Sequence, residues 1–206
     1  MLRIWGRTNS INVQKVLWCC AELELAYERI DAGGPHGVSN TPAYLAMNPN
    51  GLVPTVDDDG FVLWESNVIL RYLAAKHGRE TLYPADLKER AEAERWMDWQ
   101  VTTLWTALRP VFFGYVRTAP EQRDRAALDS AERSTAEAMA ILDRHLEGRA
   151  FVAGERFTMG DIPVGISVYR WIALPIQRPD FPHVARWYKA LTQRPGFQTH
   201  IMHPLT

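Results

Sequence analysis

The sequence predicts a mixed α/β half followed by an all-helical half. Short β-prone runs alternate with amphipathic helical runs as far as residue 79, whereas only helical patterns follow residue 88. Residues 80–88 (ETLYPADLK) have the composition of a linker between these two parts. We therefore expect two domains, one at 1–79 and one at 88–206.

The first half opens with a short β-prone run at 2–5. Apolar residues then recur at helical spacing and predict an amphipathic helix: Val13, Val16, Leu17 and Cys20. Residues 26–31 alternate between apolar and polar side chains, which predicts a second strand. Two strands joined through a helix are expected to run parallel to each other.

Residues 32–42 form a predicted loop rich in Gly, Pro, Ser and Asn, and a short helix is expected at 42–47. The apolar runs 52–56 and 61–64 are joined by DDDG, whose Asp-Gly end indicates an antiparallel hairpin. A helical run from Ser66 then closes at a glycine, so the expected order is β-α-β followed by β-β-α.

The second half contains four predicted helical runs: 88–116, 120–148, 157–174 and 183–196. Pro110 is expected to kink or break the first run, because proline lacks the N–H that an interior helical position donates. Thr158 and Asp161 stand at capping-box spacing at the start of the third, with Asp in place of the usual Glu or Gln. Pro195 and Gly196 are expected to end the last run.

The composition is that of an ordinary soluble globular protein, with 206 residues, 47% hydrophobic, 23% charged and a net charge of −1. Clustered Lys and Arg, which a nucleic-acid binder would need, are not present, and no apolar run is long enough for a membrane span. The first ten residues do not resemble a signal peptide. Cys19 and Cys20 lack metal-ligand spacing, so we expect no metal and a reducing, cytoplasmic setting.

Pro54 interrupts a strand-like run, and a proline cannot donate to a sheet ladder. It is expected where a strand begins, bulges or lies at an edge. A cis peptide after Val53 would expose the Val53 N–H and C=O to an extended peptide running antiparallel beside the strand. The alternative is an ordinary edge proline, which composition alone favours.

Glu65 and Ser66 stand where a helix begins. Ser66 suits the N-cap, and the free N–H groups of a helix N-terminus suit a carboxylate ligand. Glu65 beside it could hold an ammonium group, so the pair could receive an amino-acid head group. The alternative, which the pair alone favours, is a plain cap beside a solvated carboxylate.

Ser10 and Asn12 lie between the first strand and the first helix, at the strand end where open α/β sheets bind ligands. Either residue could instead be a simple N-cap. No nearby His or Asp pattern would make Ser10 a hydrolase nucleophile. Hydrogen-bond donation to a bound anion is the more natural role for its hydroxyl.

Four ordered motifs carry a resemblance over nearly the whole chain: SINVQKV (10–16), NPNGLVPTV (48–56), LWESNVILRYL (63–73) and GERFTMGDI (154–162). The chain resembles the cytosolic glutathione transferases, and within them the bacterial, serine-type members of theta, phi or nu kind. This resemblance implies a thioredoxin-like N-terminal domain, a helical C-terminal domain and a homodimer. It also implies glutathione, the peptide γ-Glu-Cys-Gly, as co-substrate, and a role in detoxification.

The resemblance assigns the glutathione-binding residues. It implies that Pro54 is cis and that Val53 pairs with the cysteinyl backbone of glutathione. Glu65 and Ser66 would take the γ-glutamyl amine and carboxylate, with help from Asn67. His36 in the loop 33–41 is a candidate for the glycyl carboxylate, with Asn40 and Thr41 as alternatives and a solvated loop histidine as the plain reading.

The resemblance also offers two candidates for activation of the glutathione thiol. Ser10 matches the activating serine of the serine-type classes. Asn12 matches an asparagine that contacts the sulfur in some bacterial disulfide-reducing members, which usually carry Thr in place of Ser10. The first loop offers no Tyr, and Cys19 and Cys20 lie inside the first helix, so both cysteines are read as packing residues.

An aromatic wall for the second substrate is expected on the first long helix if the family architecture holds: Trp105, Arg109, Phe112, Phe113 and Tyr115. Arg109 could bind an anionic substrate, although aromatic residues at such spacings are more often core. The expected function is glutathione transfer to an electrophile. Glutathione-dependent reduction of a disulfide or peroxide, and a non-catalytic binding protein of the same fold, are the alternatives.

Overall fold

The computed structural model describes residues 1–206 and contains one four-stranded mixed sheet. Its strands are β1 (Leu2–Trp5), β2 (Tyr27–Ile30), β3 (Thr55–Asp58) and β4 (Phe61–Trp64), in the order β2-β1-β3-β4. β1 and β2 are parallel, whereas β3 is antiparallel to both β1 and β4. The predicted parallel pair and the predicted hairpin are both confirmed.

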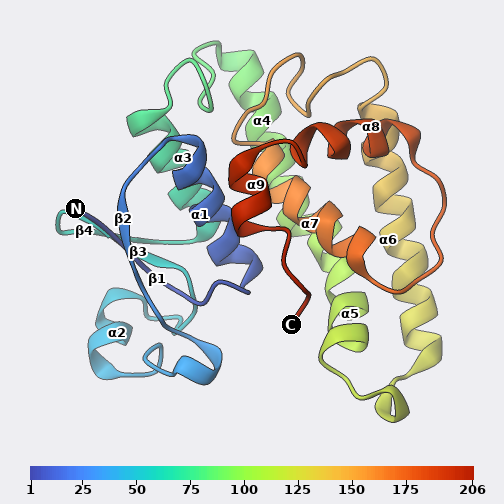
Figure 1. Ribbon diagram of the computed structural model, residues 1–206, viewed down its shortest axis with the longest axis horizontal. Helices are drawn as coiled ribbons and strands as arrows, with labels where there is room; N and C mark the ends of the chain where they lie inside the picture. Colours follow the sequence, from blue (N-terminus) through green and yellow to red (C-terminus); the bar gives the residue numbers. More distant parts are fainter.

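The sheet is covered on both faces (Figure 1). The helices α1 (Ile11–Glu22) and α3 (Ser66–His77) pack against each other on one face, and the short α2 (Pro42–Met47) lies on the other. Under α2, Tyr44 packs with Trp5 and Ala32 in a small separate core. The predicted α/β half is therefore confirmed.

The turn between β3 and β4 and the start of β3 follow from local residue chemistry. Asp59 and Gly60 turn the hairpin with φ values of 51° and 93°, the left-handed conformation that an Asp-Gly turn adopts. The Val53–Pro54 peptide is cis, as the family resemblance implied. β3 begins at Thr55 rather than at residue 52, so Pro54 lies just before the strand. A proline is compatible with an internal strand at that position, because it needs to donate no hydrogen bond to the sheet there.

The rest of the chain is helical, which confirms the predicted second half. After residue 79 the structure contains α4 (Leu87–Trp99), a π-helical segment (Gln100–Leu104), α5 (Trp105–Val116), α6 (Arg125–His145), α7 (Asp161–Ala173), α8 (Pro182–Leu191) and α9 (Pro195–His200). Short 3₁₀ turns lie at Gly34–His36 and Pro120–Gln122. None of these helices combines the length and the hydrophobicity that a bilayer crossing requires.

The structure contradicts the expected break at Pro110, the expected helix end at Pro195 and the expected N-cap at Ser66. Pro110 lies inside α5 without ending it, and the irregular turn is the π-helical segment upstream. Proline at 110 has no N–H to donate to the Thr106 carbonyl. Thr106 and Pro110 are both exposed, so water can take the place of that donor. Pro195 begins α9 instead of ending a helix, because the first helical turn needs no N–H. Ser66 is the first residue of α3, and Glu65 occupies the N-cap.

The start of α7 is held by a buried carboxylate. Asp161 accepts hydrogen bonds from the Val152 and Thr158 N–H groups at 3.0 and 2.9 Å, and from Trp187 Nε1 at 2.9 Å. The contact between Thr158 and Asp161 predicted from the capping-box spacing is present. The helix nevertheless begins at Asp161 rather than at Thr158, since Thr158 lies in the loop before it.

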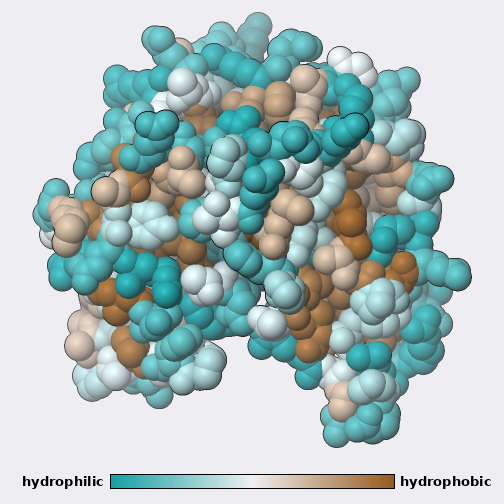
Figure 2. Space-filling view, in the orientation of Figure 1, coloured by the Kyte–Doolittle hydropathy of each residue, from teal (hydrophilic) through white to brown (hydrophobic).

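The molecule is hollowed between its two halves (Figure 2). In the view of Figure 2, hydrophobic atoms gather on the side of this hollow that α5 forms. One continuous hydrophobic core joins the two halves, because α7 and α9 pack on α1. The start of α1 consequently lies beside residues from the C-terminal part of the chain.

Candidate active site

Three separate segments meet in a small pocket of about 50 Å³ beside the start of α3. The pocket is lined by Asn12, Asn48, Asn50, Leu52, Val53, Pro54, Trp64, Glu65 and Ser66. Five of these were candidate residues from the sequence: Asn12, Val53, Pro54, Glu65 and Ser66. The lining residues belong to the start of α1, to the segment before β3, and to the end of β4 with the start of α3.

Glu65 is held in an unusual backbone conformation at the mouth of this pocket. Its φ is 72°, in the left-handed region that few residues other than glycine adopt. The carboxylate is exposed, forms no ion pair and makes no capping bond to α3. It is therefore free to receive a cationic group from a ligand.

Ser66 links α3 to α1. Its hydroxyl donates to Asn12 Oδ1 at 3.3 Å and accepts from Lys15 Nζ at 3.5 Å. Lys15 is only 1% exposed, and burial lowers the pKa of its ammonium to about 7, with Glu65 opposing the shift and Arg170 reinforcing it. Sequence reasoning missed Lys15, since a lysine in an amphipathic helix is normally taken as solvated.

Ser10 occupies the N-cap position of α1 but does not act as a cap. Its backbone has the extended conformation of an N-cap, and its carbonyl accepts from the Gln14 N–H at 2.9 Å, yet its hydroxyl makes no capping bond. The residue is buried, and its neighbours Asn9 and Asn12 line two different pockets. Its hydroxyl is thus unused by the helix.

The structure does not bring Asn67 or His36 to this pocket. The Asn67 side chain is buried and donates from Nδ2 to the Met97 carbonyl at 2.8 Å, which joins α3 to α4. His36 is exposed at the end of a 3₁₀ turn, with Nε2 3.8 Å from Asp31 Oδ1. Thr41 caps α2 by accepting from the Tyr44 N–H.

Cys19 and Cys20 are buried inside α1. Burial raises the pKa of both thiols, in the case of Cys20 to about 12. A thiol must lose its proton to act as a nucleophile, so these two cysteines contribute packing rather than chemistry.

The expected aromatic wall is divided in the structure. Trp105, Arg109 and Phe113 line one open hollow of about 460 Å³, and the Arg109 guanidinium lies 5.4 Å from the Phe113 ring centroid. Phe112 is buried instead, and the Tyr115 hydroxyl turns to α6, where it donates to Glu132 at 2.8 Å. Three of the five predicted residues therefore share a surface.

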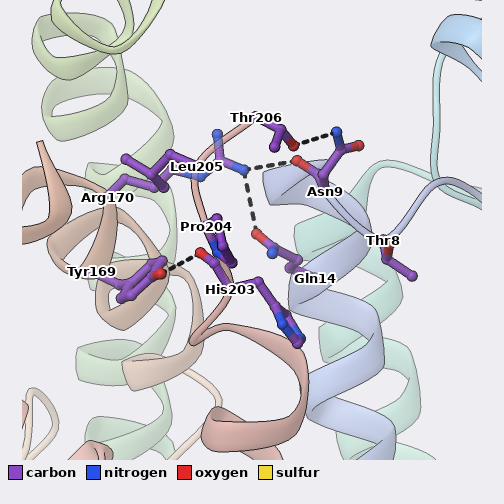
Figure 3. A pocket seen from close by; sticks show the side chains of 9 residues that line it. All are labelled: Thr8, Asn9, Gln14, Tyr169, Arg170, His203, Pro204, Leu205 and Thr206. Carbon is purple, nitrogen blue, oxygen red and sulfur yellow. Dashed lines mark hydrogen bonds between the residues drawn. The ribbon is translucent and has the colours of Figure 1, made fainter. Parts of the chain in front are cut away.

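A second pocket, of about 260 Å³, lies between the start of α1, α7 and the last four residues (Figure 3). Most of the residues that line it have polar side chains: Thr8, Asn9, Gln14, Tyr169, Arg170, His203, Pro204, Leu205 and Thr206. Arg170 donates to the Asn9 carbonyl at 3.0 Å and to Gln14 Oε1 at 3.3 Å. The sequence analysis singled out none of these residues, because the α1–α7 contact is set by tertiary packing alone.

Two family models match the chain. Residues 9–76 match the model described as "Glutathione S-transferase, N-terminal domain", and residues 103–195 match the model described as "Glutathione S-transferase, C-terminal domain".

Curated relatives include "Glutathione S-transferase GstB" of Escherichia coli strain K12, which is 43% identical over the full length of both chains. "Glutathione S-transferase D7" of Drosophila melanogaster is 35% identical over 78% of this chain and 70% of its own. "Elongation factor 1-gamma 1" of rice is 32% identical over 79% of this chain but only 39% of its own length.

Solved structures show the same likeness. A theta class glutathione S-transferase of Xanthomonas axonopodis pv. citri, crystallised with glutathione bound, has 47% identity and a TM-score of 0.96, covering 100% of this chain and 99% of its own. A glutathione transferase of Bombyx mori has 27% identity and a TM-score of 0.85, covering 97% of this chain and 92% of its own.

Proposed function

We propose that this chain, which belongs to the glutathione S-transferase family, binds glutathione in the pocket beside α3 and activates its thiol for attack on an electrophile. The observation that carries the proposal is the convergence of Asn12, Val53, Pro54, Glu65 and Ser66. The glutathione-bound structure of the Xanthomonas relative, with 47% identity over the full chain, supports it.

The groups around the pocket suit the γ-glutamyl and cysteinyl parts of glutathione. The unpaired Glu65 carboxylate would take the amine, while Ser66 and the free N–H groups of the first α3 turn would take the carboxylate. Lys15 beneath Ser66 adds a positive charge on the same side. Val53 makes no backbone hydrogen bond within the chain, so its N–H and C=O are open to the cysteinyl backbone.

Thiolate activation falls to Ser10 and Asn12. A free thiol with a pKa of about 8.5 is mostly protonated at neutral pH, and each unit of lowering needs about 1.4 kcal/mol of differential stabilisation. A donated hydrogen bond from Ser10 and the positive end of α1 both favour the anion. The thiol proton passes to water. The sulfur electron pair then forms the new bond to the electrophilic carbon, and the leaving group departs with its own electron pair.

The remaining assignments belong to the same proposal. Trp105 and Phe113 form an aromatic wall for the second substrate, with the Arg109 cation beside them, and His36 is a candidate for the glycyl carboxylate. Asn67 supports the site from α3 through its bond to α4. A homodimer, a cytoplasmic setting and a role in detoxification are part of the proposal, supported by the family resemblance and the composition.

The test compares Ser10→Ala with Asn12→Ala. Ser10→Ala should raise the pKa of bound glutathione and reduce turnover of chlorodinitrobenzene about tenfold, the effect of losing ~1.4 kcal/mol of stabilisation. Thiolate absorbance against pH reports the first quantity, and steady-state assays the second. Ser10→Thr retains the hydroxyl and should retain most of the activity. An unchanged pH profile in Ser10→Ala would reduce Ser10 to a helix-start residue.

Disulfide or peroxide reduction on the same site is the close alternative, because Asn12 lines the pocket and Ser10 does not. Under this alternative Asn12→Ala damages reduction at least as much as conjugation. Both variants should therefore be assayed with an electrophile, a disulfide and a peroxide.

A non-catalytic binding protein is the second alternative, and the similarity to a rice protein that is named as an elongation factor, not as a transferase, favours it. Retention on immobilised glutathione without turnover of any of these substrates would support it.

A further inference from the structure

Three arginines surround the loop before α1, and none of them pairs with an acidic side chain. Arg7, Arg117 and Arg170 take part in none of the chain's ion pairs. Like charges that lie close together repel, and this repulsion is strongest where water is excluded. The free energy cost of such a cluster needs a physical reason.

Arg170 is the most deeply placed member of the cluster. It is only 5% exposed, and its Nε has no hydrogen-bond partner. The guanidinium stacks over the Phe112 ring at 4.3 Å and lies 5.7 Å from the Trp105 ring centroid. Its terminal nitrogen reaches into the 260 Å³ pocket of Figure 3, where it finds only neutral acceptors on Asn9 and Gln14.

Arg7 and Arg117 approach the same pocket through two of its lining residues. Arg7 donates to Asn9 Oδ1 at 2.7 Å, and Arg117 donates to the Thr206 backbone oxygen at 2.7 Å. Asn9 in turn donates to Thr206 Oγ1 at 2.7 Å, so one chain of hydrogen bonds joins both arginines at the pocket mouth. The Arg7 Nε is also buried without a partner.

The electrostatics of the cluster agree with its geometry. Burial, Arg117 and Arg7 together lower the pKa of Arg170 to about 9, and burial with Arg117 lowers the pKa of Arg7. With a pKa of about 9, Arg170 remains mainly protonated near pH 7. Stacking on Phe112 explains how Arg170 is stabilised, but it does not explain why Arg7 and Arg117 are gathered beside it.

We propose that this pocket binds a small anionic group, a carboxylate, of the second substrate, so that negatively charged electrophiles are the preferred substrate class. A planar guanidinium with unused donors suits a carboxylate. The inference rests on the proposed function and specifies its substrate. Asn9 lines this pocket and Asn12 lines the glutathione pocket, so an electrophile anchored at Arg170 would present its far end to the glutathione sulfur beside Ser10.

A matched pair of aromatic electrophiles tests the proposal: para-chloro-meta-nitrobenzoate and the corresponding neutral amide. With either compound the thiolate sulfur forms the carbon–sulfur bond, and the carbon–chlorine bond breaks with its electron pair leaving as chloride. The carboxylate does not react and serves only as the anchor. For each variant, kcat/KM for the anion is divided by kcat/KM for the amide. When this ratio is compared between variants, the difference in intrinsic reactivity between the two compounds cancels.

Arg170→Gln should lower this ratio about tenfold or more, the effect of losing a charge-assisted hydrogen bond. Arg117→Gln, at an exposed position, should lower it about threefold, and less at high salt. Arg144→Gln removes an exposed charge from α6 outside the pocket and should leave the ratio unchanged. The KM for glutathione should stay constant in all three variants.

Several results would overturn the proposal. Equal losses with both electrophiles would make Arg170 a structural or thiolate-stabilising residue. A raised KM for glutathione with an unchanged ratio would assign the arginines to the carboxylates of glutathione itself. If Arg170→Gln does not fold, the Arg7→Gln/Arg117→Gln double variant replaces it, and an unchanged ratio there counts against the pocket.

Calorimetry without glutathione separates this inference from the proposed function. If the wild type turns over neither compound, the proposed function fails. The anion site is still supported if the wild type binds the benzoate more tightly than the amide and the arginine variants lose benzoate binding. Equal binding of benzoate and amide to the wild type contradicts it.

Discussion

Glu65 is the residue whose geometry most clearly indicates ligand binding. A left-handed backbone at a residue other than glycine costs about 1–3 kcal/mol and persists only where the surrounding structure imposes it. At Glu65 this conformation leaves the carboxylate exposed and unpaired at the mouth of the pocket beside α3. A carboxylate in that position is available for the ammonium group of glutathione.

Replacing Glu65 with Gln should weaken glutathione binding by roughly 1.5–3 kcal/mol, the value of a hydrogen bond to a charged group. Isothermal calorimetry measures the affinity directly. Glu24→Gln is a matched control, because Glu24 is also exposed and has a φ of 52° but lies outside the pocket. Equal affinity in the Glu65 variant and the wild type would remove Glu65 from the binding site.

Lys15 gives the protein a measurable pH dependence. Its pKa is about 7 in the folded chain and 10.5 in the unfolded reference. Between these two values the unfolded chain binds one more proton than the folded chain, so the contribution of Lys15 to the free energy of unfolding rises with pH by up to about 1.4 kcal/mol per unit. Below pH 7 both states carry the charge, and the full cost of its burial remains.

Lys15→Met should therefore raise the free energy of unfolding most at about pH 7 and progressively less toward about pH 10. Urea denaturation of wild type and variant at both pH values gives this difference. The same variant should weaken glutathione binding, because the charge 3.5 Å from Ser66 Oγ is lost. A stability difference that does not depend on pH would show that Lys15 is not buried as a titrating group.

At the scale of elements, the start of α7 holds several parts of the helical half together. Asp161 joins the loop at Val152, the turn at Thr158 and the Trp187 ring of α8 through separate hydrogen bonds. Burial raises the pKa of Asp161 and the hydrogen bonds lower it; burial has the larger effect, and the pKa is about 6. Removing the carboxylate would leave three buried donors without an acceptor.

Asp161→Ala should accordingly lower the free energy of unfolding by roughly 3 kcal/mol or more. Asp124→Ala is the control, since Asp124 caps the exposed start of α6 through one bond to the Ala127 N–H and should cost only about 1 kcal/mol. Urea denaturation compares the two variants. Similar losses in both would mean that Asp161 is no more than an ordinary helix cap.

The sequence was sufficient to predict the helices and strands that depend on interactions between residues close together in the chain. Apolar spacing located α1, and the turn 59–60 located the hairpin, because side-chain period and turn chemistry act within a few residues. Pro110 and Pro195 were misread, since a proline can start, interrupt or follow a helix depending on the chain around it. The buried charge of Lys15 could not be predicted, because Ser66 of α3 and Arg170 of α7 come close to it only in the folded chain.

The same distinction applies to the two pockets. The pocket beside α3, where we propose that glutathione binds, could be predicted from contiguous motifs such as 48–56 and 63–73, whose residues meet after short connections. The pocket at Arg170 joins residues more than 150 positions apart, as the contacts of Arg170 with Asn9 and Gln14 show. No local pattern marks such a pair.

For the whole molecule, exposed apolar side chains lie on the N-terminal half, and a hollow lies on the helical half. Leu52 is 68% exposed, and Phe61 on β4 and Val68 on α3 are also exposed. Between the α5 and α6 helices lies an open hollow of about 670 Å³ lined mainly by small residues such as Ala107 and Ala131. Two copies related by a twofold axis could each place the apolar residues of one in the hollow of the other.

The family resemblance predicts a homodimer, and we propose that these two surfaces form its contact. Light scattering after size exclusion should then give about 47 kDa, twice the chain mass of 23.5 kDa. Leu52→Glu should shift the mass toward one chain, because a buried unpaired carboxylate opposes association. Leu87→Glu changes a residue that is 72% exposed at the start of α4 and should leave the dimer intact. A wild-type mass near 23.5 kDa would contradict the dimer, whereas a dimer that survives Leu52→Glu would place the contact elsewhere. Since Leu52 also lines the glutathione pocket, dissociation should weaken glutathione binding as well.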